Sequence, residues 1–350
     1  MNFFNTLLFI FVVVTSALFS NDRRVVLVTG GAGYIGSHTC KALKEAGFIP
    51  VTYDSLALGS AESVKWGPLV IGDLLDIEAL DKAFATYQPF AVLHFAALRN
   101  VGESVNDPSS YYTNNVAGSI NLLNVMHKYQ VEHIIFSSSC TVYGNCSYSP
   151  ISETYVKAPI NPYAMSKYIV ERMITDYSEA YKFTYMILRY FNAAGVEVDS
   201  GLKRSIHSCG FLIPRALLAI LYPDTPLHIF GTDYPTPDGT CIRDYIHVKD
   251  LADAHVLALK HLQKGNGSNE INLGTGRGDS VLDIIQTIEE VTGRKVPYEL
   301  RLARKGDVLE AVADARKASA ILGFQPRYSD LHEIIKSEWI SIQNTILKKS

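Results

Sequence analysis

The stretch Val25-Val26-Leu27-Val28-Thr29-Gly30-Gly31-Ala32-Gly33-Tyr34-Ile35-Gly36 decides the fold. Its β-branched beginning predicts a buried strand over Val25–Thr29, and the amphipathic residues that follow predict a helix over Ile35–Ala46, closed by Gly47. The glycines between them allow a tight turn and a close approach of the backbone to a ligand. Because a helix N-terminus presents amide hydrogens to phosphate oxygens, this strand-loop-helix order predicts a dinucleotide-binding loop rather than a plain tight turn.

The rest of the first half repeats this alternation of apolar runs and amphipathic stretches. Further strands are predicted at Pro50–Tyr53, Leu69–Ile71, Ala91–Phe95, His133–Ser138 and Thr184–Arg189. Helices between them are predicted at Ile77–Tyr87, Tyr112–Tyr129 and Tyr163–Tyr181. Repeated strand-helix-strand units imply an α/β fold of Rossmann-like type, a doubly wound parallel sheet that binds ligands at its carboxyl edge.

The regular alternation of predicted strands and helices ends after Tyr190, where glycine, proline and aspartate become frequent. Helices are predicted again near Leu251–Leu262 and Val281–Thr292. We therefore expect a smaller C-terminal substrate lobe that is interleaved with the first. The predicted division assigns residues 23–189, with a return segment of about 246–275, to the dinucleotide-binding domain, and residues 190–245 and 276–350 to the substrate-binding lobe.

The composition suits a globular protein and excludes several classes of partner. Of the 350 residues, 47% are apolar and 19% are charged, which is ample for a large core. The formal net charge is -3 and no basic run is longer than a pair, so we expect no nucleic-acid partner. The cysteines lack CxxC spacing and the histidines lack metal-ligand spacing, which argues for reduced thiols and no metal site.

Residues 1–22 form an apolar leader. Phe3–Phe19 is almost entirely apolar and is followed by Arg23-Arg24. A cleaved signal peptide would need a basic start and a small-x-small cleavage site, which are missing, and the run is short for a spanning helix. A start-site artefact, an anchor that leaves the domain in the cytoplasm, and export are three alternatives. We expect a cytoplasmic protein that is bound to a membrane only if residues 3–19 are an anchor.

Two aspartates follow the second and third strands at the predicted ligand-binding edge. Asp54 lies where a carboxylate accepts hydrogen bonds from the adenosine ribose and repels a 2'-phosphate, so NAD is favoured over NADP. Asp73 is placed either to meet the adenine amine or to cap the next helix. The run His94-Phe95-Ala96-Ala97-Leu98 ends the fourth strand, and its small residues would let the backbone lie against the nicotinamide.

The most informative pair is Tyr163 and Lys167, preceded by Ser137-Ser138-Ser139 at the end of the fifth strand. Residues four apart share a helix face, so an ammonium would stand beside a phenol. That neighbour, together with a positive nicotinamide ring, favours the phenolate and would lower the pKa of the Tyr163 phenol toward neutrality. With Ser139 completing a proton relay, these three residues form the candidate catalytic set.

Polar residues after the sixth strand and in the second lobe indicate a phosphorylated substrate. Asn192 is placed to donate to a diphosphate, and Phe191 to pack on the nicotinamide. Arg243 and the run Arg304-Lys305-Gly306-Asp307 bring guanidinium groups, whose planar fork bonds two phosphate oxygens at once. Each arginine taken alone is better explained by a solvated surface position, and the surrounding motifs favour the phosphate-binding role.

Together these motifs resemble those of the UDP-glucose (UDP-galactose) 4-epimerases, which belong to the extended short-chain dehydrogenases. The resemblance extends from Val25 to the C-terminus and is strongest over Thr29–Thr39, Leu93–Ser104, Ser137–Gly144 and Asp238–His255. With the glycine loop, it implies that NAD is lined by Gly30, Gly33, Tyr34, Ile35, Gly36, Asp54, Ser55, Leu56, Gly59, Asp73, Leu74, Phe95, Ala96, Ala97, Arg99, Asn114, Tyr163, Lys167 and Phe191. It implies that the UDP-sugar is held by Ser139, Asn192, Leu212, Phe230, Arg243, Arg304, Asp307 and Ala311.

The resemblance further implies an isomerase that inverts C4 of a UDP-hexose through a 4-keto intermediate, with NAD as a transient hydride store, and that forms a homodimer. A UDP-pentose or UDP-uronate 4-epimerase remains an alternative because it differs only in its pocket lining. A nucleotide-sugar 4,6-dehydratase is disfavoured because Cys140-Thr141 stand where it carries an Asp-Glu pair. A non-catalytic NAD-binding protein is disfavoured because Tyr163 and Lys167 are both present.

Three features separate this chain from the family's common pattern. Arg99 stands where relatives usually carry lysine, and residues 201–211 differ from the family's acidic, asparagine-containing loop. Ala311 stands at a position that faces the sugar near C2, where enzymes strict for glucose and galactose carry tyrosine. Because alanine leaves room for an N-acetyl group, we also expect activity on UDP-N-acetylhexosamines, unless another side chain closes the pocket.

Overall fold

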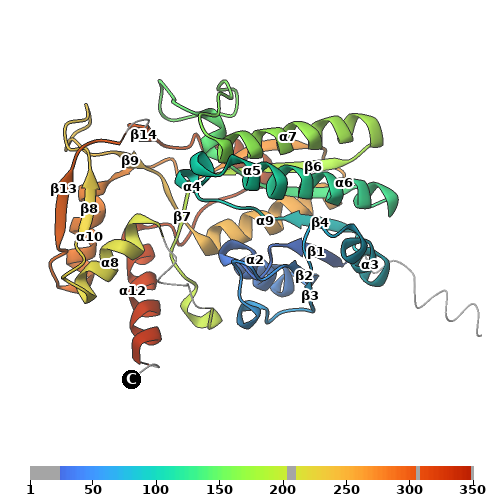
Figure 1. The fold of residues 1–350 in the computed structure, drawn as a ribbon, viewed down its shortest axis with the longest axis horizontal. Coiled ribbons are helices and arrows are strands. Elements are labelled where there is room, and N and C mark those ends of the chain that lie inside the picture. Colours follow the sequence, from blue (N-terminus) through green and yellow to red (C-terminus); the bar gives the residue numbers. More distant parts are fainter. Residues whose placement is uncertain (1–23, 203–209, 305–307, 348–350) are drawn as a thin grey trace, which may run out of the picture.

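The computed structural model describes residues 24–202, 210–304 and 308–347, and its centre is a seven-stranded parallel sheet (Figure 1). Its strands are β1 (Val25–Thr29), β2 (Ile49–Asp54), β3 (Leu69–Ile71), β4 (Ala91–His94), β5 (His133–Ser139), β6 (Thr184–Tyr190) and β11 (Asn269–Leu273). They are ordered β11-β6-β5-β4-β1-β2-β3, so the chain winds outward in two directions from β1 and β4. The carboxyl ends of β1 and β4 therefore meet at the switch point where doubly wound sheets bind ligands.

Helices cover both faces of this sheet. One face is covered by α2 (Tyr34–Glu45) and α9 (Val248–Gln263), and the other by α3 (Ile77–Tyr87), α6 (Gly118–Lys128) and α7 (Pro162–Tyr181). Alternate strand residues point to opposite faces, which is visible in β1. Val26 and Val28 are buried in one core with Leu43 of α2, whereas Leu27 is buried in the other with Leu80 of α3.

A smaller group of elements lies beside the sheet, at the left of Figure 1. Its core joins α8 (Leu212–Leu221), β8 (Leu227–Phe230), α10 (Val281–Thr292) and α12 (Leu331–Leu347), while β13 (Tyr298–Arg301) pairs with β8. Two small sheets connect it to the rest. The first pairs β7 (Asn192–Ala194) with β10 (Tyr245–His247), and the second has the order β12 (Asp279–Ser280), β9 (Ile242–Arg243), β14 (Glu310–Ala311).

Short elements complete the chain. The helices α4 (Val101–Asn106) and α5 (Pro108–Tyr111) and the π-helical segment η2 (Tyr112–Ala117) lead into α6, and α11 (Arg316–Leu322) packs on β11 and α9. The 3-10 turns are η1 (Ala61–Ser63), η3 (Cys140–Tyr143) and η4 (Val198–Ser200).

The expected α/β doubly wound fold is confirmed, and most predicted boundaries lie within one residue of the observed ones. The predictions were incomplete, however, and they lacked α8, α11 and α12 among the helices. The helix expected over Tyr112–Tyr129 begins with η2, and β11 was not predicted as a strand. The polar residues of β11 hide its pattern, because Glu270 bonds to a buried arginine and Asn272 to a buried tyrosine. The division into two domains at the expected boundaries stays a prediction.

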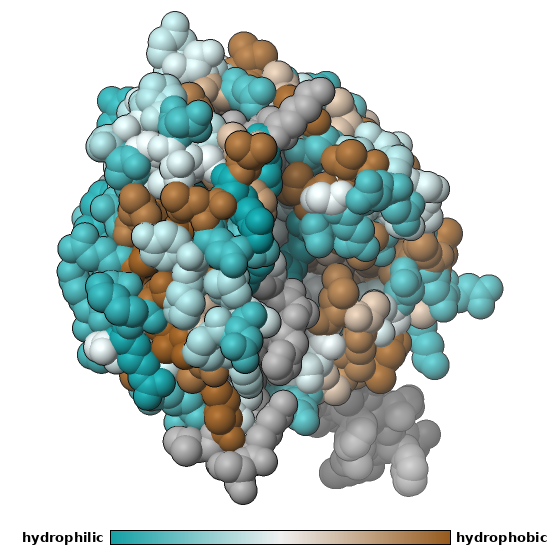
Figure 2. Space-filling model, turned by 60° about the vertical axis from the view of Figure 1, so that its left-hand side comes forward, coloured by the Kyte–Doolittle hydropathy of each residue, from teal (hydrophilic) through white to brown (hydrophobic). Residues whose placement is uncertain are grey.

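The described residues contain no helix long and apolar enough to cross a membrane. On the face drawn in Figure 2, hydrophobic residues form scattered patches between hydrophilic ones. The leader, residues 1–22, lies outside the described residues.

Candidate active site

A cavity of about 560 Å³ lies along the carboxyl ends of the central strands. It receives residues from the ends of β2, β5 and β6, from the loops that follow β1 and β4, and from the starts of α2 and α7. The predicted residues that line it are Gly30, Gly33, Tyr34, Ile35, Gly36, Asp54, Ser55, Gly59, Asp73, Leu74, Phe95, Ala96, Ala97, Arg99, Asn114, Ser139, Tyr163, Lys167, Phe191, Asn192, Arg243 and Ala311. Residues spread over nearly 300 positions of the sequence are therefore brought to one cavity.

The glycine loop is shaped by two close approaches of backbone. A Cβ on Gly30, whose φ is +72°, would lie 2.6 Å from the backbone nitrogen of Ala96, and one on Gly36 would lie 2.3 Å from the carbonyl oxygen of Gly30. Neither position has room for a side chain. The cap of α2 is Gly33, which offers no side chain to the first amides of the helix, so the helix start faces the cavity with its backbone donors.

Asp54 ends β2 at the side of this loop and is 8% exposed. One carboxylate oxygen accepts from the amide of Ala32 at 2.9 Å, and the other from the amide of Leu56 at 2.8 Å. These bonds orient the carboxylate at the cavity. Leu56, expected to line the cofactor, is not among the lining residues, and its contribution is this amide, presented from a left-handed backbone with φ +62°.

Asp73 lines the cavity and does not cap a helix. The side chain that caps α3 is that of Asp76, which accepts from the amide of Ala79 at 3.0 Å. The Asp73 carboxylate accepts from the amide of Leu75 at 2.9 Å. Of the two roles that the sequence left for Asp73, the structure therefore disfavours the helix cap.

Tyr163, Lys167 and Ser139 meet where β5 ends and α7 begins. Asn161 caps α7 by accepting from the amide of Ala164 at 2.9 Å, which places Tyr163 in the first turn and Lys167 one turn later. Lys167 Nζ donates to the carbonyl oxygen of Ser137 at 2.8 Å. The Ser139 hydroxyl interacts with the Tyr163 phenol and favours its ionised form, which suits the two groups to a proton relay.

Burial dominates the ionisation of this pair. It raises the pKa of the Tyr163 phenol to about 12, opposed by the hydrogen bond with Ser139 and by the charge of Arg99. It lowers the pKa of the Lys167 ammonium to about 7, opposed by the charge of Glu171. The expected lowering of the phenol pKa by Lys167 is therefore wrong for the protein groups alone, because desolvation disfavours the charged form of both residues.

The predicted substrate residues divide between two adjoining cavities. Asn192, Arg243 and Ala311 line the main cavity, where Ala311 of β14 pairs with Arg243 of β9. A second cavity of about 250 Å³ shares Asn192 and Arg243 with the first and is also lined by Leu212, Phe230 and Arg304. The Arg304 guanidinium lies 4.7 Å from the centre of the Phe230 ring. Asp307 lies outside the described residues.

These features match a known family. The model described as the NAD dependent epimerase/dehydratase family matches residues 26–274. The chain belongs to this family. It is 47% identical to the UDP-glucose 4-epimerase of Rhizobium leguminosarum bv. trifolii, over 90% of this chain and 96% of the relative.

Solved structures agree with this assignment. The UDP-glucose 4-epimerase of Brucella ovis in complex with NAD superposes with a TM-score of 0.88 and is 49% identical over 90% of this chain and 97% of its own. The UDP-Glc/GlcNAc 4-epimerase of Campylobacter jejuni has a TM-score of 0.80 and 37% identity over 91% and 99%. The resemblance drawn from the motifs, and the expectation of NAD as cofactor, are confirmed.

The chemistry of the site in this epimerase/dehydratase-family chain fits NAD. The glycine loop leaves no space for side chains where a diphosphate would approach the start of α2, and Asp54 offers a buried carboxylate to a ribose. Phe95, Ala96 and Ala97 line the cavity directly after β4 with small or flat groups. Among the described residues, no group of three or more His, Cys, Asp or Glu side chains is gathered as metal ligands would be.

Sequence reasoning missed several lining residues of this epimerase/dehydratase-family site. Phe211, at the start of α8, borders both cavities, and the Arg99 guanidinium lies 5.0 Å from its ring centre. Most of the others follow strand ends or precede helices, a signal that could have found them: Tyr53, Gly72, Cys140, Thr141, Gly144, Asn161, Tyr190 and Ala193. Cys146, Ile151, Ile160 and Val308 come from loops without such a signal.

Proposed function

We propose that this chain interconverts UDP-glucose and UDP-galactose by inverting C4 of the sugar through a 4-keto intermediate. The observation that supports this most directly is the meeting of Tyr163, Ser139 and Lys167 in the same cavity as the glycine loop and Asp54. That arrangement joins acid-base groups to a dinucleotide site, as oxidation of a hydroxyl carbon requires. The relatives named above are UDP-glucose 4-epimerases, which supports a nucleotide sugar as the substrate.

In the proposed reaction NAD supplies a reversible hydride acceptor, and the protein supplies proton transfer and position. Tyr163 takes the proton of the C4 hydroxyl, directly or through Ser139, and later returns it to the oxygen. Both residues line the same cavity, and the Ser139 hydroxyl favours the ionised form of the phenol, which supports this path. Lys167, held by the carbonyl oxygen of Ser137, stabilises the phenolate while it exists.

The proposed binding of the substrate spans both cavities. Asn192 and Arg243 border the two cavities, so they are suited to bonding the diphosphate between sugar and uridine. Leu212, Phe230 and Arg304 then surround the nucleoside end. The sugar end lies toward Tyr163 and Ala311. We also propose that residues 23–189 and about 246–275 form the dinucleotide-binding domain, and that residues 190–245 and 276–350 form the substrate-binding lobe.

The experiment is incubation of the purified protein, without added NAD, with UDP-galactose and UDP-glucose, followed by separation of the products. We expect conversion in both directions, and release of NAD rather than NADP on denaturation. Conversion only of a UDP-pentose or UDP-uronate in the same assay would replace the proposed substrate. Release of NADP would contradict the role given to Asp54.

We also propose that the pocket accepts UDP-N-acetylhexosamines. Ala311 lines the cavity and is 9% exposed, so its small side chain contributes to the shape of the pocket. A tyrosine there would fill space beside the sugar. The similarity to the UDP-Glc/GlcNAc 4-epimerase of Campylobacter jejuni supports this second substrate.

By resemblance to the family we propose a homodimer in the cytoplasm, where NAD and nucleotide sugars are supplied. Light scattering of the purified protein is expected to give twice the chain mass of 38.7 kDa. A monomeric mass would contradict the dimer. Recovery of the full chain in the membrane fraction, lost when residues 1–22 are deleted, would contradict a purely cytoplasmic location and favour the anchor.

A further inference from the structure

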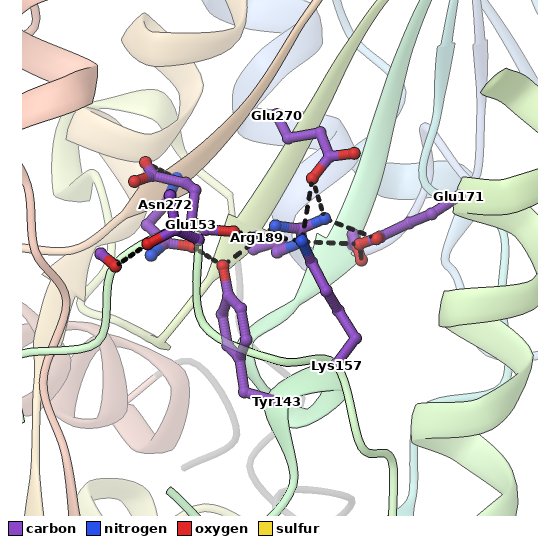
Figure 3. A network of polar contacts seen from close by, with 10 residues as sticks. Tyr143, Glu153, Lys157, Glu171, Arg189, Glu270 and Asn272 are labelled. Atoms are coloured by element: carbon purple, nitrogen blue, oxygen red, sulfur yellow. Dashed lines mark hydrogen bonds and ion pairs between the residues drawn. The ribbon is translucent and has the colours of Figure 1, made fainter. Parts of the chain in front are cut away.

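A largely buried cluster of charged and polar side chains joins β6, α7 and β11 (Figure 3). At its centre is Arg189 of β6, which is 0% exposed. Its Nε and Nη2 donate to the two carboxylate oxygens of Glu171 on α7 at 2.9 and 2.7 Å, a bidentate pair. Its Nη1 donates to the hydroxyl of Tyr143 at 3.0 Å.

The outer end of the cluster reaches solvent. Arg189 Nη2 also donates to Glu270 of β11 at 2.5 Å, and Glu270 in turn lies 3.5 Å from Lys157 Nζ. Glu270 is partly exposed, whereas Glu171 is buried. Of the two carboxylates, Glu171 is therefore the one whose charge, like that of Arg189, acts in a water-poor environment, where charges interact strongly.

Glu171 is linked to the catalytic residues from two sides. It follows Lys167 by one turn of α7, so both side chains share a helix face. It also accepts a hydrogen bond from Ser138 Oγ at 2.5 Å. Ser138 lies between Ser137, whose carbonyl oxygen accepts from Lys167, and Ser139, which lines the active-site cavity.

The other groups around Lys167 do not supply a negative charge. His94 of β4 is buried and neutral, since burial lowers its pKa to about 3, and it bonds to the hydroxyls of Thr29 and Ser119. The Phe136 ring of β5 lies 4.9 Å from Lys167 Nζ. Tyr163 stays neutral because burial raises the pKa of its phenol. Of these described neighbours, Glu171 is the one that favours the ammonium form.

We propose that Glu171, held by Arg189, is a positioning residue that keeps Lys167 protonated and directed at the active site near neutral pH. The proposal rests on the proposed function, because Lys167 matters only if Tyr163 must become a phenolate. It predicts that the loss of activity at alkaline pH depends on a charge that does not touch substrate or cofactor.

The test compares the pH dependence of kcat/KM for UDP-galactose in the wild type and in Glu171→Gln, with bound NAD measured in each sample. In Glu171→Gln we expect the alkaline fall of kcat/KM to occur at a pH lower by roughly one unit, because the negative charge beside Lys167 is lost and its ammonium form is less favoured. Glu171→Asp, which retains the charge, is expected to keep the wild-type pH profile with a lower turnover. Glu270→Gln is the matched control, since Glu270 bonds the same arginine but does not adjoin Lys167, and its pH profile is expected to stay in place.

If Glu171→Gln fails to fold, the double variant Glu171→Gln with Arg189→Met is compared with Arg189→Met alone, because these two proteins differ only in the charge at position 171. The proposal is overturned by a folded Glu171→Gln with the wild-type pH profile, or by a double variant with the pH profile of Arg189→Met. An independent readout is the titration of the Lys167 Nζ signal in ¹⁵N-lysine-labelled protein, assigned by its loss in Lys167→Met. If the wild type is inactive but Lys167 Nζ titrates at a lower pH in Glu171→Gln, the epimerase function is contradicted and the role of Glu171 is retained. If Lys167 Nζ titrates at the same pH in both proteins, the role of Glu171 is contradicted.

Discussion

At the scale of single residues, the motif of Tyr163 and Lys167 predicts where the two side chains lie but not how they ionise. The sequence places them one helical turn apart and so predicts their proximity, and both line one cavity. It does not predict that the pKa of Tyr163 rises and that of Lys167 falls, because burial depends on every element packed around α7. Activation of the phenol therefore depends on charges that arrive with the ligands, and the positive nicotinamide ring is one of them.

The first residue-scale prediction concerns Tyr163→Phe. Removal of the phenol oxygen is expected to lower kcat for UDP-galactose by about 10²–10⁴-fold, the usual contribution of general acid-base catalysis, while NAD stays bound. Tyr177→Phe on the same helix is the control, because its hydroxyl bonds Asn124 away from the cavity. Turnover near that of the control would remove Tyr163 from the role of base.

A second residue-scale prediction concerns Ala311→Tyr. The larger ring is expected to abolish conversion of UDP-N-acetylglucosamine while sparing that of UDP-glucose, because it fills space that only the N-acetyl group needs. Ala311→Ser should retain both activities. The measurement is the ratio of the conversion rates of UDP-N-acetylglucosamine and UDP-glucose on the same enzyme samples. Equal loss of both activities would show that Ala311 does not select the substrate.

At the scale of elements, the junction of β1 and α2 depends on a glycine at position 36. Gly36→Ala would place a methyl group 2.3 Å from the carbonyl oxygen of Gly30, so the loop must shift. We expect loss of bound NAD and a lower free energy of unfolding, by about 1–3 kcal/mol as for other overpacked sites. Gly102→Ala in α4 is the control, since its Cβ would meet the nearest atom, Asn100 Oδ1, at an ordinary 3.6 Å. Equal NAD content in the two variants would contradict the close-approach argument.

The elements also show where prediction from sequence stops. Strands with continuous apolar runs, such as β1 and β5, were predicted within a residue. By contrast β11, whose Glu270 and Asn272 bond to side chains distant in sequence, looks like a loop until Arg189 and Tyr143 are placed beside it. The same limit applies to the residues that line the active-site cavity. Residues in motifs were found, while Phe211 and Val308 line the cavity through tertiary packing that no local pattern reports.

At the scale of the whole molecule, buried histidines should make the protein labile to acid. Burial lowers the pKa of His94 to about 3 and those of His247 and His255 to about 4, from 6.5. Between these values each of the three histidines binds more protons in the unfolded chain than in the folded one. Their contribution to stability is therefore constant above pH 6.5 and falls as the pH drops through this window. Each histidine should remove about 2 kcal/mol by about pH 5.

Urea unfolding at about pH 7.5 and about pH 5 measures this dependence. His94→Gln should lower stability at neutral pH yet reduce the difference between the two pH values. His332→Gln is the control, because that ring is 58% exposed. A wild type whose free energy of unfolding is the same at both pH values would show that these histidines are not kept neutral by burial.

Within the described residues, the chain passes between the central sheet with its helices and the smaller group of elements five times, from β6 to β7, β10 to α9, β11 to β12, β14 to α11 and α11 to α12. Tyr190, Phe191 and Asn192, at the first of these crossings, line the cavity themselves. Exchange of the substrate-binding half with that of a relative by recombination would therefore need a cut at each of these crossings, one of them through the active site. A chain that crosses so often between its two parts resists the exchange of whole parts and favours changes of sugar specificity by replacement of individual side chains, the role that we propose for the alanine at position 311.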